Sequence, residues 1–470
     1  MSEWKKVKIG EFLTEREGRF KPDDKRISKY QRLDKIDFSG NIHLSNKPTK
    51  TDMILVQSGD LVISGINVAK GAITVYQGDE PVCATIHYSS YTFDCSKVDL
   101  DYFKFFVKSD AFVAAIQKQV KGGIKTEIKP KHLLPLEISI PDLQTQKKIV
   151  KDISFQLEKT EQLSFEIAKQ KAYAKQLRQN ILQEAIEGKL TADWRKQHPV
   201  QKGNPDYDAE ALFEQIQKEK NHTDLFAPNG AHAKKAKSVS SEPIRVTRKE
   251  KSLPPITEDE IPFEIPAGWK WVRLGEIIQE PPRNGYSPKA VDFETPIKTL
   301  KLGAVTYGVF DPSEFKYINE KIPEDAYCWL KNGDFLIERS NSFEYVGICA
   351  IYTGKDNEFM YPDLLMRFRT AEILSKEYVH SALVSPFNRE YFMTNAKGAQ
   401  KTMPKINQEC VVNTIIPLPP LAEQKEIVAR VEQHLQTITQ LETQIATRET
   451  TTKQLMQSIL KDAFEEKEIC

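Results

Sequence analysis

One stretch of this chain occurs twice, and the repeat constrains the fold more than any other feature of the sequence. Residues 141–189 return as residues 419–467 at one constant offset, without an insertion or deletion. A gapless repeat of this length predicts that both copies adopt the same structure. Matched positions include Pro141 with Pro419, Leu143 with Leu421, Gln146 with Gln424, Ile149 with Ile427, Leu177 with Leu455, Ile181 with Ile459 and Ala185 with Ala463.

Each copy is predicted to form one long helix. Apolar residues recur every three, four or seven positions, no Gly or Pro interrupts the pattern, and Gly188 suits a helix end. A helix of about 45 residues would be about 65–70 Å long, so a small core cannot cover its apolar stripe. The other copy is the simplest partner, which predicts a coiled coil. The residues expected between the helices or at docked subunits are Ile149, Ile153, Leu157, Ile167, Leu177, Ile181, Ile427, Val431, Leu435, Ile445, Leu455 and Ile459.

A single helix of this kind is typical of a dimerisation element. Two copies of identical length favour a different interpretation, in which the length of the rod matters, as it does in a ruler.

The composition indicates a protein that stays in the cytoplasm. The chain has 470 residues, 40% of them hydrophobic and 28% charged, and a formal net charge of +1, which suits two or three soluble domains. The first residues lack the apolar core of a signal peptide, and we expect no membrane span. Six cysteines without a CxxC pair indicate reduced thiols rather than a disulfide framework or a zinc site.

The order of segments predicts an α+β chain in which one mixed fold is used twice, each copy followed by a long helix. The expected blocks are residues 1–140 and 263–418, and the expected helices are residues 141–190 and 419–470. Residues 191–262 are expected to be a solvated linker, because most of this stretch is poor in large apolar residues and rich in Lys, Ser, Ala and Pro.

The second block echoes the first at separate markers. Residues 4–11 (WKKVKIGE) match residues 269–276 (WKWVRLGE), and Ser58-Gly59-Asp60 matches Asn332-Gly333-Asp334. Strands are expected on both sides of the first turn, at residues 53–56 and 61–64. The offset drifts between the markers, so the blocks are expected to differ in their loops while the helices do not.

No catalytic motif is found in the sequence. There is no GxxxxGK[ST] loop, and the histidines lack the spacing of metal ligands. Asn204-Pro205-Asp206-Tyr207 resembles the motif of amino-methyltransferases, but it lacks the second proline and the preceding glycine-rich turn. We therefore expect no metal ion and no catalytic residue in this chain.

Basic loops precede both long helices, and flexible Gly with Lys, Thr, Gln and Asn suits contact with a DNA backbone and with base edges. A turn in each block is a second candidate, in which Arg339 would read guanine and Asn341 adenine. Solvated loops and plain strand connections are the alternative. Equivalent placement in both blocks puts DNA contact level with a solvated loop for the lysines, whereas a plain strand connection stays the simpler interpretation of the turns. The candidate DNA-binding residues are Asn67, Lys70, Lys121, Lys125, Lys129, Lys131, Arg339, Asn341, Lys397, Gln400, Lys401 and Lys405.

These features together resemble the specificity subunit of type I restriction–modification systems. The starts of the long helices, at residues 140–149 and 418–427, are similar to the family pattern IPLPPLxEQ(K/R)xI. Residues 177–190 are similar to the pattern LRqsILqxAfxGkL, and residues 256–269 to the family's entry into its second block. The chain departs from these patterns at Asp142 and Thr145, where Pro and Glu are usual, and at Glu466, which stands in the place of Gly188.

The resemblance implies a DNA-recognition role without catalysis. Each block would be a target-recognition domain for one half of a split double-stranded DNA site, and the antiparallel helices would set the gap between the halves. Two modification subunits would bring S-adenosylmethionine and adenine N6 methylation, and two restriction subunits would bring ATP, Mg and cleavage. This chain would bind no cofactor directly. The alternatives are a coiled-coil scaffold that displays two protein-binding domains, which predicts no salt-dependent affinity for DNA, and a nuclease or methyltransferase active without partners.

Overall fold

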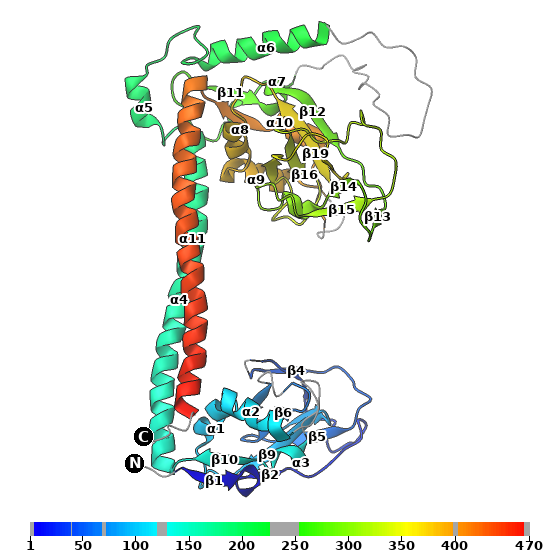
Figure 1. The fold of residues 1–470 in the computed structure, drawn as a ribbon, viewed down its shortest axis with the longest axis vertical. Coiled ribbons are helices and arrows are strands. Elements are labelled where there is room, and N and C mark those ends of the chain that lie inside the picture. Colours follow the sequence, from blue (N-terminus) through cyan, green and yellow to red (C-terminus); the bar gives the residue numbers. More distant parts are fainter. Residues whose placement is uncertain are drawn as a thin grey trace. The chain divides into compact units, whose positions relative to one another are not determined.

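The protein forms two compact units, each of which combines small β-sheets, short helices and parts of two long helices (Figure 1). The computed structural model describes residues 4–38, 40–67, 72–119, 129–225, 253–397 and 403–464. The first unit comprises residues 1–170 and 444–470, and the second comprises residues 171–443. The expected α+β class and the two mixed units are confirmed.

In the first unit, a two-stranded antiparallel sheet leads into and out of the domain: β1 (Lys5–Lys8) pairs with β10 (Glu137–Ile140). One four-stranded sheet has the order β2-β9-β6-β7 and the other the order β4-β3-β8-β5. The remaining elements are η1 (Ile9–Glu11), β2 (Leu13–Glu15), β3 (Arg32–Ile36), β4 (Ile42–Ser45), β5 (Met53–Val56), β6 (Leu61–Ser64), β7 (Ile73–Val75), β8 (Val82–Thr85), β9 (Tyr88–Phe93), α1 (Leu100–Phe106), α2 (Asp110–Gln119) and α3 (Pro130–Leu133).

The second unit repeats this plan. β11 (Lys270–Arg273) pairs antiparallel with β20 (Ile415–Leu418), and two four-stranded sheets have the orders β12-β19-β16-β17 and β13-β15-β14-β18. The remaining elements are α5 (Ala192–Gln197), α6 (Ala209–Leu225), η3 (Glu258–Glu260), α7 (Leu274–Ile277), β12 (Ile278–Asn284), β13 (Ala290–Val291), β14 (Ile297–Leu300), η4 (Leu302–Ala304), β15 (Phe315–Ile318), β16 (Phe335–Glu338), β17 (Cys349–Ile351), β18 (Phe359–Met360), β19 (Leu365–Thr370), α8 (Lys376–Leu383), α9 (Pro386–Asn395) and α10 (Gln408–Asn413).

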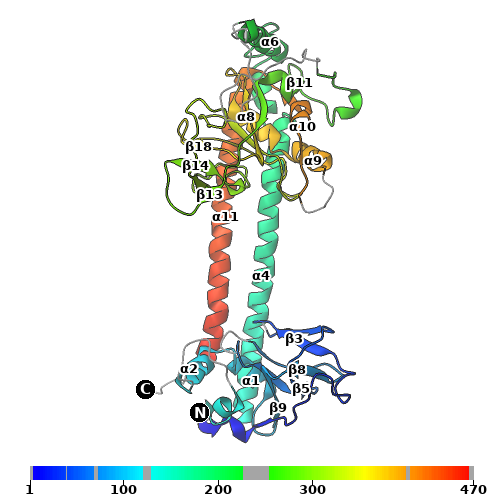
Figure 2. The same ribbon diagram turned by 90° about the vertical axis from the view of Figure 1, so that its right-hand side faces the viewer.

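The two long helices, α4 (Leu143–Ile186) and α11 (Leu421–Phe464), have 44 residues each and run side by side (Figure 2). In the first unit, Arg448 donates a hydrogen bond to Gln170 (3.5 Å), and in the second, Arg178 donates to Glu442 (3.0 Å). Residue numbers fall along α11 as they rise along α4, so the pair is antiparallel, as predicted. Neither these helices nor any other helix in the described ranges has an apolar run long enough to cross a membrane.

Most of the predicted stripe lies in the seam between the helices, but two leucines do not. Leu177 and Leu455 are 44% and 47% exposed, so they lie outside the seam, and their expected place at a docked subunit stays a prediction. A coiled-coil seam admits about two positions per heptad, and in this part of α4 those positions hold Ala174 and Ile181. Leu177 therefore lies on the flank of the seam. Seven predicted residues are buried and three half-buried: Ile153, Ile167, Ile181, Ile427, Val431, Ile445 and Ile459, and Ile149, Leu157 and Leu435.

A buried glutamine joins each long helix to the domain beside it. Gln146, in the first turn of α4, donates from Nε2 to the carbonyl of Pro141 (2.8 Å). Its Oε1 accepts from the backbone N–H of Asp99 (2.7 Å), the residue that caps α1. One neutral side chain thus fixes the start of the long helix against the start of a domain helix.

The second unit repeats this joint at Gln424. Its amide donates to the carbonyl of Pro419 (2.9 Å) and accepts from the N–H of Ser375 (3.1 Å), which caps α8. The matched glutamines therefore do the same structural work in both units, which the gapless repeat predicts.

The matched Ser58-Gly59-Asp60 and Asn332-Gly333-Asp334 turns have the same backbone. Gly59 and Gly333 take φ angles of 84° and 85°, a left-handed conformation that favours glycine. The carboxylate that follows each glycine is buried and paired with arginine: Asp60 with Arg16, and Asp334 with Arg367 and Arg369. Glycine and aspartate are thus both required by the turn, which explains why the marker survives in both blocks.

The predicted linker is wrong over residues 191–225, which belong to the folded second unit. Leu212 and Ile216 on α6 are fully buried, and the N–H of Ala209 donates to the carbonyl of Gly268 (2.9 Å). The prediction took residues 191–225 into the linker because the polar composition of residues 226–252 dominated the stretch and the apolar face of α6 is short. Residues 226–252 lie outside the described residues.

Candidate nucleic-acid interface

Three loops of the second unit meet at the end of β16, around Glu338. The Glu338 side chain is buried and accepts hydrogen bonds from Thr306 Oγ1 (2.6 Å) and Asn341 Nδ2 (2.7 Å). Burial raises the pKa of the Glu338 carboxyl, against the opposing effect of these two hydrogen bonds. The carboxylate thereby ties the turn after η4 to the turn after β16.

The third loop is a hairpin that carries two of the predicted lysines. Lys397 and Lys405 exchange two backbone hydrogen bonds of 2.9 Å, and the N–H of Ile406 donates to the carbonyl of Arg339 (3.0 Å). Both lysine side chains are exposed, and neither has an acidic partner within the described ranges. Arg339 is half-buried and donates to the carbonyl of Asp363 (3.3 Å). The structure therefore brings Arg339, Lys397 and Lys405 together, whereas Gln400 and Lys401 lie outside the described residues.

Asn341 forms hydrogen bonds within its own turn. Its Nδ2 donates to Glu338, and its Oδ1 accepts from the backbone N–H of Ser342 (2.8 Å). One N–H and one oxygen lone pair of the amide are thus used to brace the turn, and one of each remains. The expected bidentate contact of Asn341 to adenine therefore stays a prediction. The sequence signal for this partner is Glu338 itself, an acidic residue at the end of an otherwise apolar strand, β16.

The first unit has a turn at the same place, after β6. Asn67 donates from its backbone to the carbonyl of Ser64 and accepts from the N–H of Ala72, both at 3.2 Å. Lys129 and Lys131, at the start of α3, are exposed. Lys70, Lys121 and Lys125 lie outside the described residues. In this unit the structure therefore places three of the predicted residues without joining them into one site.

The raised pKa of Glu338 predicts a pH-dependent stability difference. A carboxyl whose pKa is higher in the folded state than in the unfolded state stabilises the fold below its ordinary pKa of about 4.5 and loses that contribution as the pH rises through the raised value. Glu338→Gln keeps an acceptor for Asn341 and carries no charge. We expect the variant to gain stability relative to the unaltered chain between pH 5 and pH 8. Urea unfolding of both proteins across this range measures the effect; parallel curves would contradict it.

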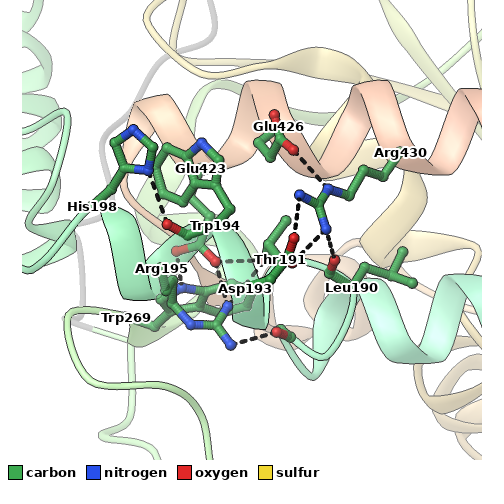
Figure 3. A network of polar contacts seen from close by, with 11 residues as sticks. Leu190, Thr191, Asp193, Trp194, Arg195, His198, Trp269, Glu423, Glu426 and Arg430 are labelled. Atoms are coloured by element: carbon green, nitrogen blue, oxygen red, sulfur yellow. Dashed lines mark hydrogen bonds and ion pairs between the residues drawn. The ribbon is translucent and has the colours of Figure 1, made fainter.

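A second polar cluster of the second unit is buried where α11 begins (Figure 3). The side chain of Glu423 is almost fully buried and accepts from Thr191 Oγ1 (2.6 Å), from Trp269 Nε1 (2.7 Å) and from the guanidinium of Arg195. Arg195 also donates to the carbonyl of Gly188 (2.5 Å). The cluster fastens the segment that follows α4 to the first turn of α11.

Arg430 makes a second connection between the segment that follows α4 and the start of α11. It donates to Asp193 Oδ1 (2.6 Å), to Glu426 (2.6 Å) and to the carbonyl of Leu190 (2.6 Å), as Figure 3 shows. The hydrogen bond from Arg430 is the largest cause that holds the pKa of the Asp193 carboxyl at about 2. The ion pair therefore persists over the whole physiological pH range.

The Asn204-Pro205-Asp206-Tyr207 motif lies beside this cluster and has a structural role. The carbonyls of Pro205 and Asp206 accept from the N–H groups of Leu421 (3.1 Å) and Ala422 (3.2 Å), which have no partner inside α11. Next to it, the rings of Trp194 and His198 stack with their centroids 4.1 Å apart. A cavity of about 310 Å³ opens among these residues, and Arg195 and Glu423, which line it, are already paired with each other.

The fold thus uses one mixed α+β unit twice, and each unit includes parts of the same two long helices. The chain matches the type I restriction modification DNA specificity domain over residues 1–170 and 266–448, and it belongs to that family. The match covers the sheets of both units and most of both long helices.

Relatives and one solved structure agree with this assignment. The chain is 27% identical over 294 residues to the type I restriction enzyme EcoEI specificity subunit of Escherichia coli, covering 61% of this chain and 45% of that protein. It is 25% identical over 363 residues to the EcoKI specificity subunit of Escherichia coli strain K12, covering 76% and 63%. These matches span less than two thirds of either relative. A solved structure from work on complex assembly and conformational transition of the type I R-M system has the same fold, with a TM-score of 0.58 at 18% identity over 98% of this chain and 97% of that one.

Proposed function

We propose that this chain is the DNA sequence-specificity subunit of a type I restriction–modification complex and recognises a bipartite site, one half with each unit. The observation that carries the proposal is the duplication itself. Two units share a three-sheet plan, the same Gly-Asp turn and the same glutamine joint to helices of equal length. A protein that reads two separate half-sites needs two similar readers and a fixed connection between them.

The paired helices would act as the ruler between the half-sites. Both are uninterrupted over 44 residues, and the repeat contains no insertion in either copy. The units, by contrast, differ by insertions in their loops. Variable loops suit recognition of a changeable target sequence. A helical pair of constant length suits a constant spacing between the half-sites.

Two modification subunits would dock on the flanks of the helical pair. In the first unit, exposed Leu163 and Leu455 lie at the same level of the antiparallel register, and in the second unit exposed Leu177 and Leu441 do so. Each unit thus has an equivalent apolar pair for one copy of the same partner. We propose that these partners bring S-adenosylmethionine and adenine N6 methylation, that restriction subunits bring ATP and Mg, and that the complex acts in the cytoplasm on double-stranded DNA. This chain itself would carry out no catalysis.

The test combines sequencing and binding. Modified-base sequencing of a host with and without this gene should reveal N6-methyladenine in a split motif that disappears on deletion. The complex purified with its partners should bind duplexes that carry this motif with an affinity that falls as salt rises. Unchanged methylation together with salt-independent or absent DNA binding would favour the protein-binding scaffold instead.

Arg339 and Lys405 are expected to affect recognition in different ways. Arg339→Ala should relax specificity in one half-site only and cost about 1–3 kcal/mol at the cognate site, because an arginine that reads guanine distinguishes bases. Lys405→Ala should weaken binding to all sequences similarly and reduce the salt slope by about one, because it contacts phosphate. Duplex binding at several salt concentrations separates the two; a specificity change in both half-sites would contradict the assignment of Arg339.

A further inference from the structure

The loops around Glu338 expose aromatic side chains to solvent. Tyr307, in the turn after η4, is 83% exposed, and Phe343, in the turn after β16, is 45% exposed. The Tyr307 hydroxyl has no hydrogen-bond partner among the described residues. Large apolar side chains in water gain nothing from the fold itself, and these two lie on loops that are both tied to Glu338, through Thr306 and Asn341.

The turn that presents Tyr307 is fixed on both sides. Thr306 donates to the buried carboxylate of Glu338 (2.6 Å), which rules out free movement of the preceding residue. Gly308 donates to the carbonyl of Val305 (2.9 Å) and takes a φ angle of 74°, a left-handed conformation that favours glycine. The exposed ring is therefore held out on a rigid turn, so little conformational entropy would be lost when it binds.

Cations lie on the loops joined to the same strand end. The hairpin with Lys397 and Lys405 is hydrogen-bonded to Arg339, the residue directly after Glu338. Exposed rings and lysines on loops joined to one strand end have complementary partners in nucleic acid, because the bases offer apolar faces and the phosphates offer negative charge.

The first unit exposes an apolar residue on the corresponding turn. Ile66, in the turn after β6, is 49% exposed. The turn is anchored in the same way in both units: the N–H of Gly65 donates to the carbonyl of His87 (2.9 Å), and the N–H of Arg339 donates to the carbonyl of Leu364 (2.9 Å). Exposure of a large apolar side chain is thus a property of this turn and not of one loop sequence.

We infer that Tyr307 and Phe343 contact the bases of one DNA half-site directly, with the Tyr307 ring stacked on a base or wedged between two base pairs. This inference rests on the proposed function and specifies which residues of the second unit carry it. Aromatic side chains bind DNA by stacking on a base or by insertion between base steps, and the ring itself adds affinity without a phosphate contact of its own.

The test uses the full chain purified with its partner subunits and a duplex carrying the methylated motif found by sequencing. Tyr307→Ala should lower affinity for this duplex on the order of tenfold, with an unchanged salt slope. Tyr307→Phe, which keeps the ring, should bind as the unaltered chain does. Phe343→Ala gives an independent measurement with a loss in the same direction. Phe293→Ala removes an aromatic residue that is 53% exposed, close to the value for Phe343, from the connection between β13 and β14, and it should change nothing.

Two results would overturn the inference. Tyr307→Ala and Phe343→Ala that bind as tightly as the unaltered chain would exclude base contact, and an equal loss in Phe293→Ala would show that any exposed aromatic has the same effect. Failure of the unaltered chain to bind any duplex in a salt-dependent way is a different outcome, which would reject the proposed function itself. The melting temperature of Tyr307→Ala should remain unchanged, because that ring is largely in water, and melting temperatures of the other variants control for a loss of stability.

Discussion

Insertion of one heptad into both α4 and α11 is expected to widen the unspecified gap in the methylated DNA site by about three base pairs. Seven residues add about 10 Å to a helix, and one base pair rises about 3.4 Å. The insertions belong at the level of the hydrogen bond between Gln170 and Arg448, where they stay opposite each other and keep the seam in phase. Modified-base sequencing of a host that carries the variant reads the new gap directly.

The two half-site sequences should remain unchanged, because no loop of either unit is altered. A heptad inserted in α4 alone is the matched control. It would displace one helix along the other, so that buried seam residues such as Ile167 and Ile445 no longer face their partners, and methylation should be lost. A double insertion that changes either half-site would rule out the ruler.

Replacement of Glu423 by alanine is expected to destabilise the second unit by about 3–5 kcal/mol, since one partner of a buried ion pair would be removed. The guanidinium of Arg195 and the indole N–H of Trp269 would lose the carboxylate that accepts their hydrogen bonds. The stability of Glu423→Gln should lie between that of Glu423→Ala and that of the unaltered chain, because the glutamine amide retains a neutral acceptor. Urea unfolding monitored by tryptophan fluorescence measures the effect, because Trp269 is buried in this cluster.

The repeat supplies a control for this variant. Thr145 stands at the position in α4 that Glu423 has in α11, and its hydroxyl bonds only to Asp142, at the exposed surface (2.9 Å). Thr145→Ala should cost no more than about 1 kcal/mol. If both variants lose the same stability, the cluster around Glu423 contributes nothing beyond an ordinary helix start.

The fold was largely predictable because the sequence contains an internal repeat, so that each half can be compared with the other. The helix pair follows from a gapless match, and the strands at Met53–Val56 and Leu61–Ser64 lie where the turn Ser58-Gly59-Asp60 separates two apolar runs. Residues 191–225 occur only once in the chain, so no second copy supported their helices. Leu177 could not be assigned to the seam or to its flank, because helical spacing alone does not distinguish the two.

The candidate site was predictable only in part, for a physical reason. Equivalent placement in both blocks pointed to the turn at Arg339 and to the loop at Lys397 and Lys405, but their proximity depends on the hydrogen bond from Ile406 to Arg339, between residues far apart in the sequence. The structural role of Asn341 depends on the burial of Glu338, which is a property of the packed unit.

The glutamine joints have a consequence for how this protein responds to its solvent. Gln146 and Gln424 are buried and neutral, and they bond only to backbone groups, so neither a proton nor a counterion competes for these contacts. Exposed lysines such as Lys397 and Lys405, in contrast, are surrounded by ions that any phosphate must displace. Ionic strength would therefore change how tightly such a protein holds DNA while the angle between each domain and its helix stays constant. The affinity for DNA thus depends on ionic strength, whereas the geometry of the glutamine joints does not.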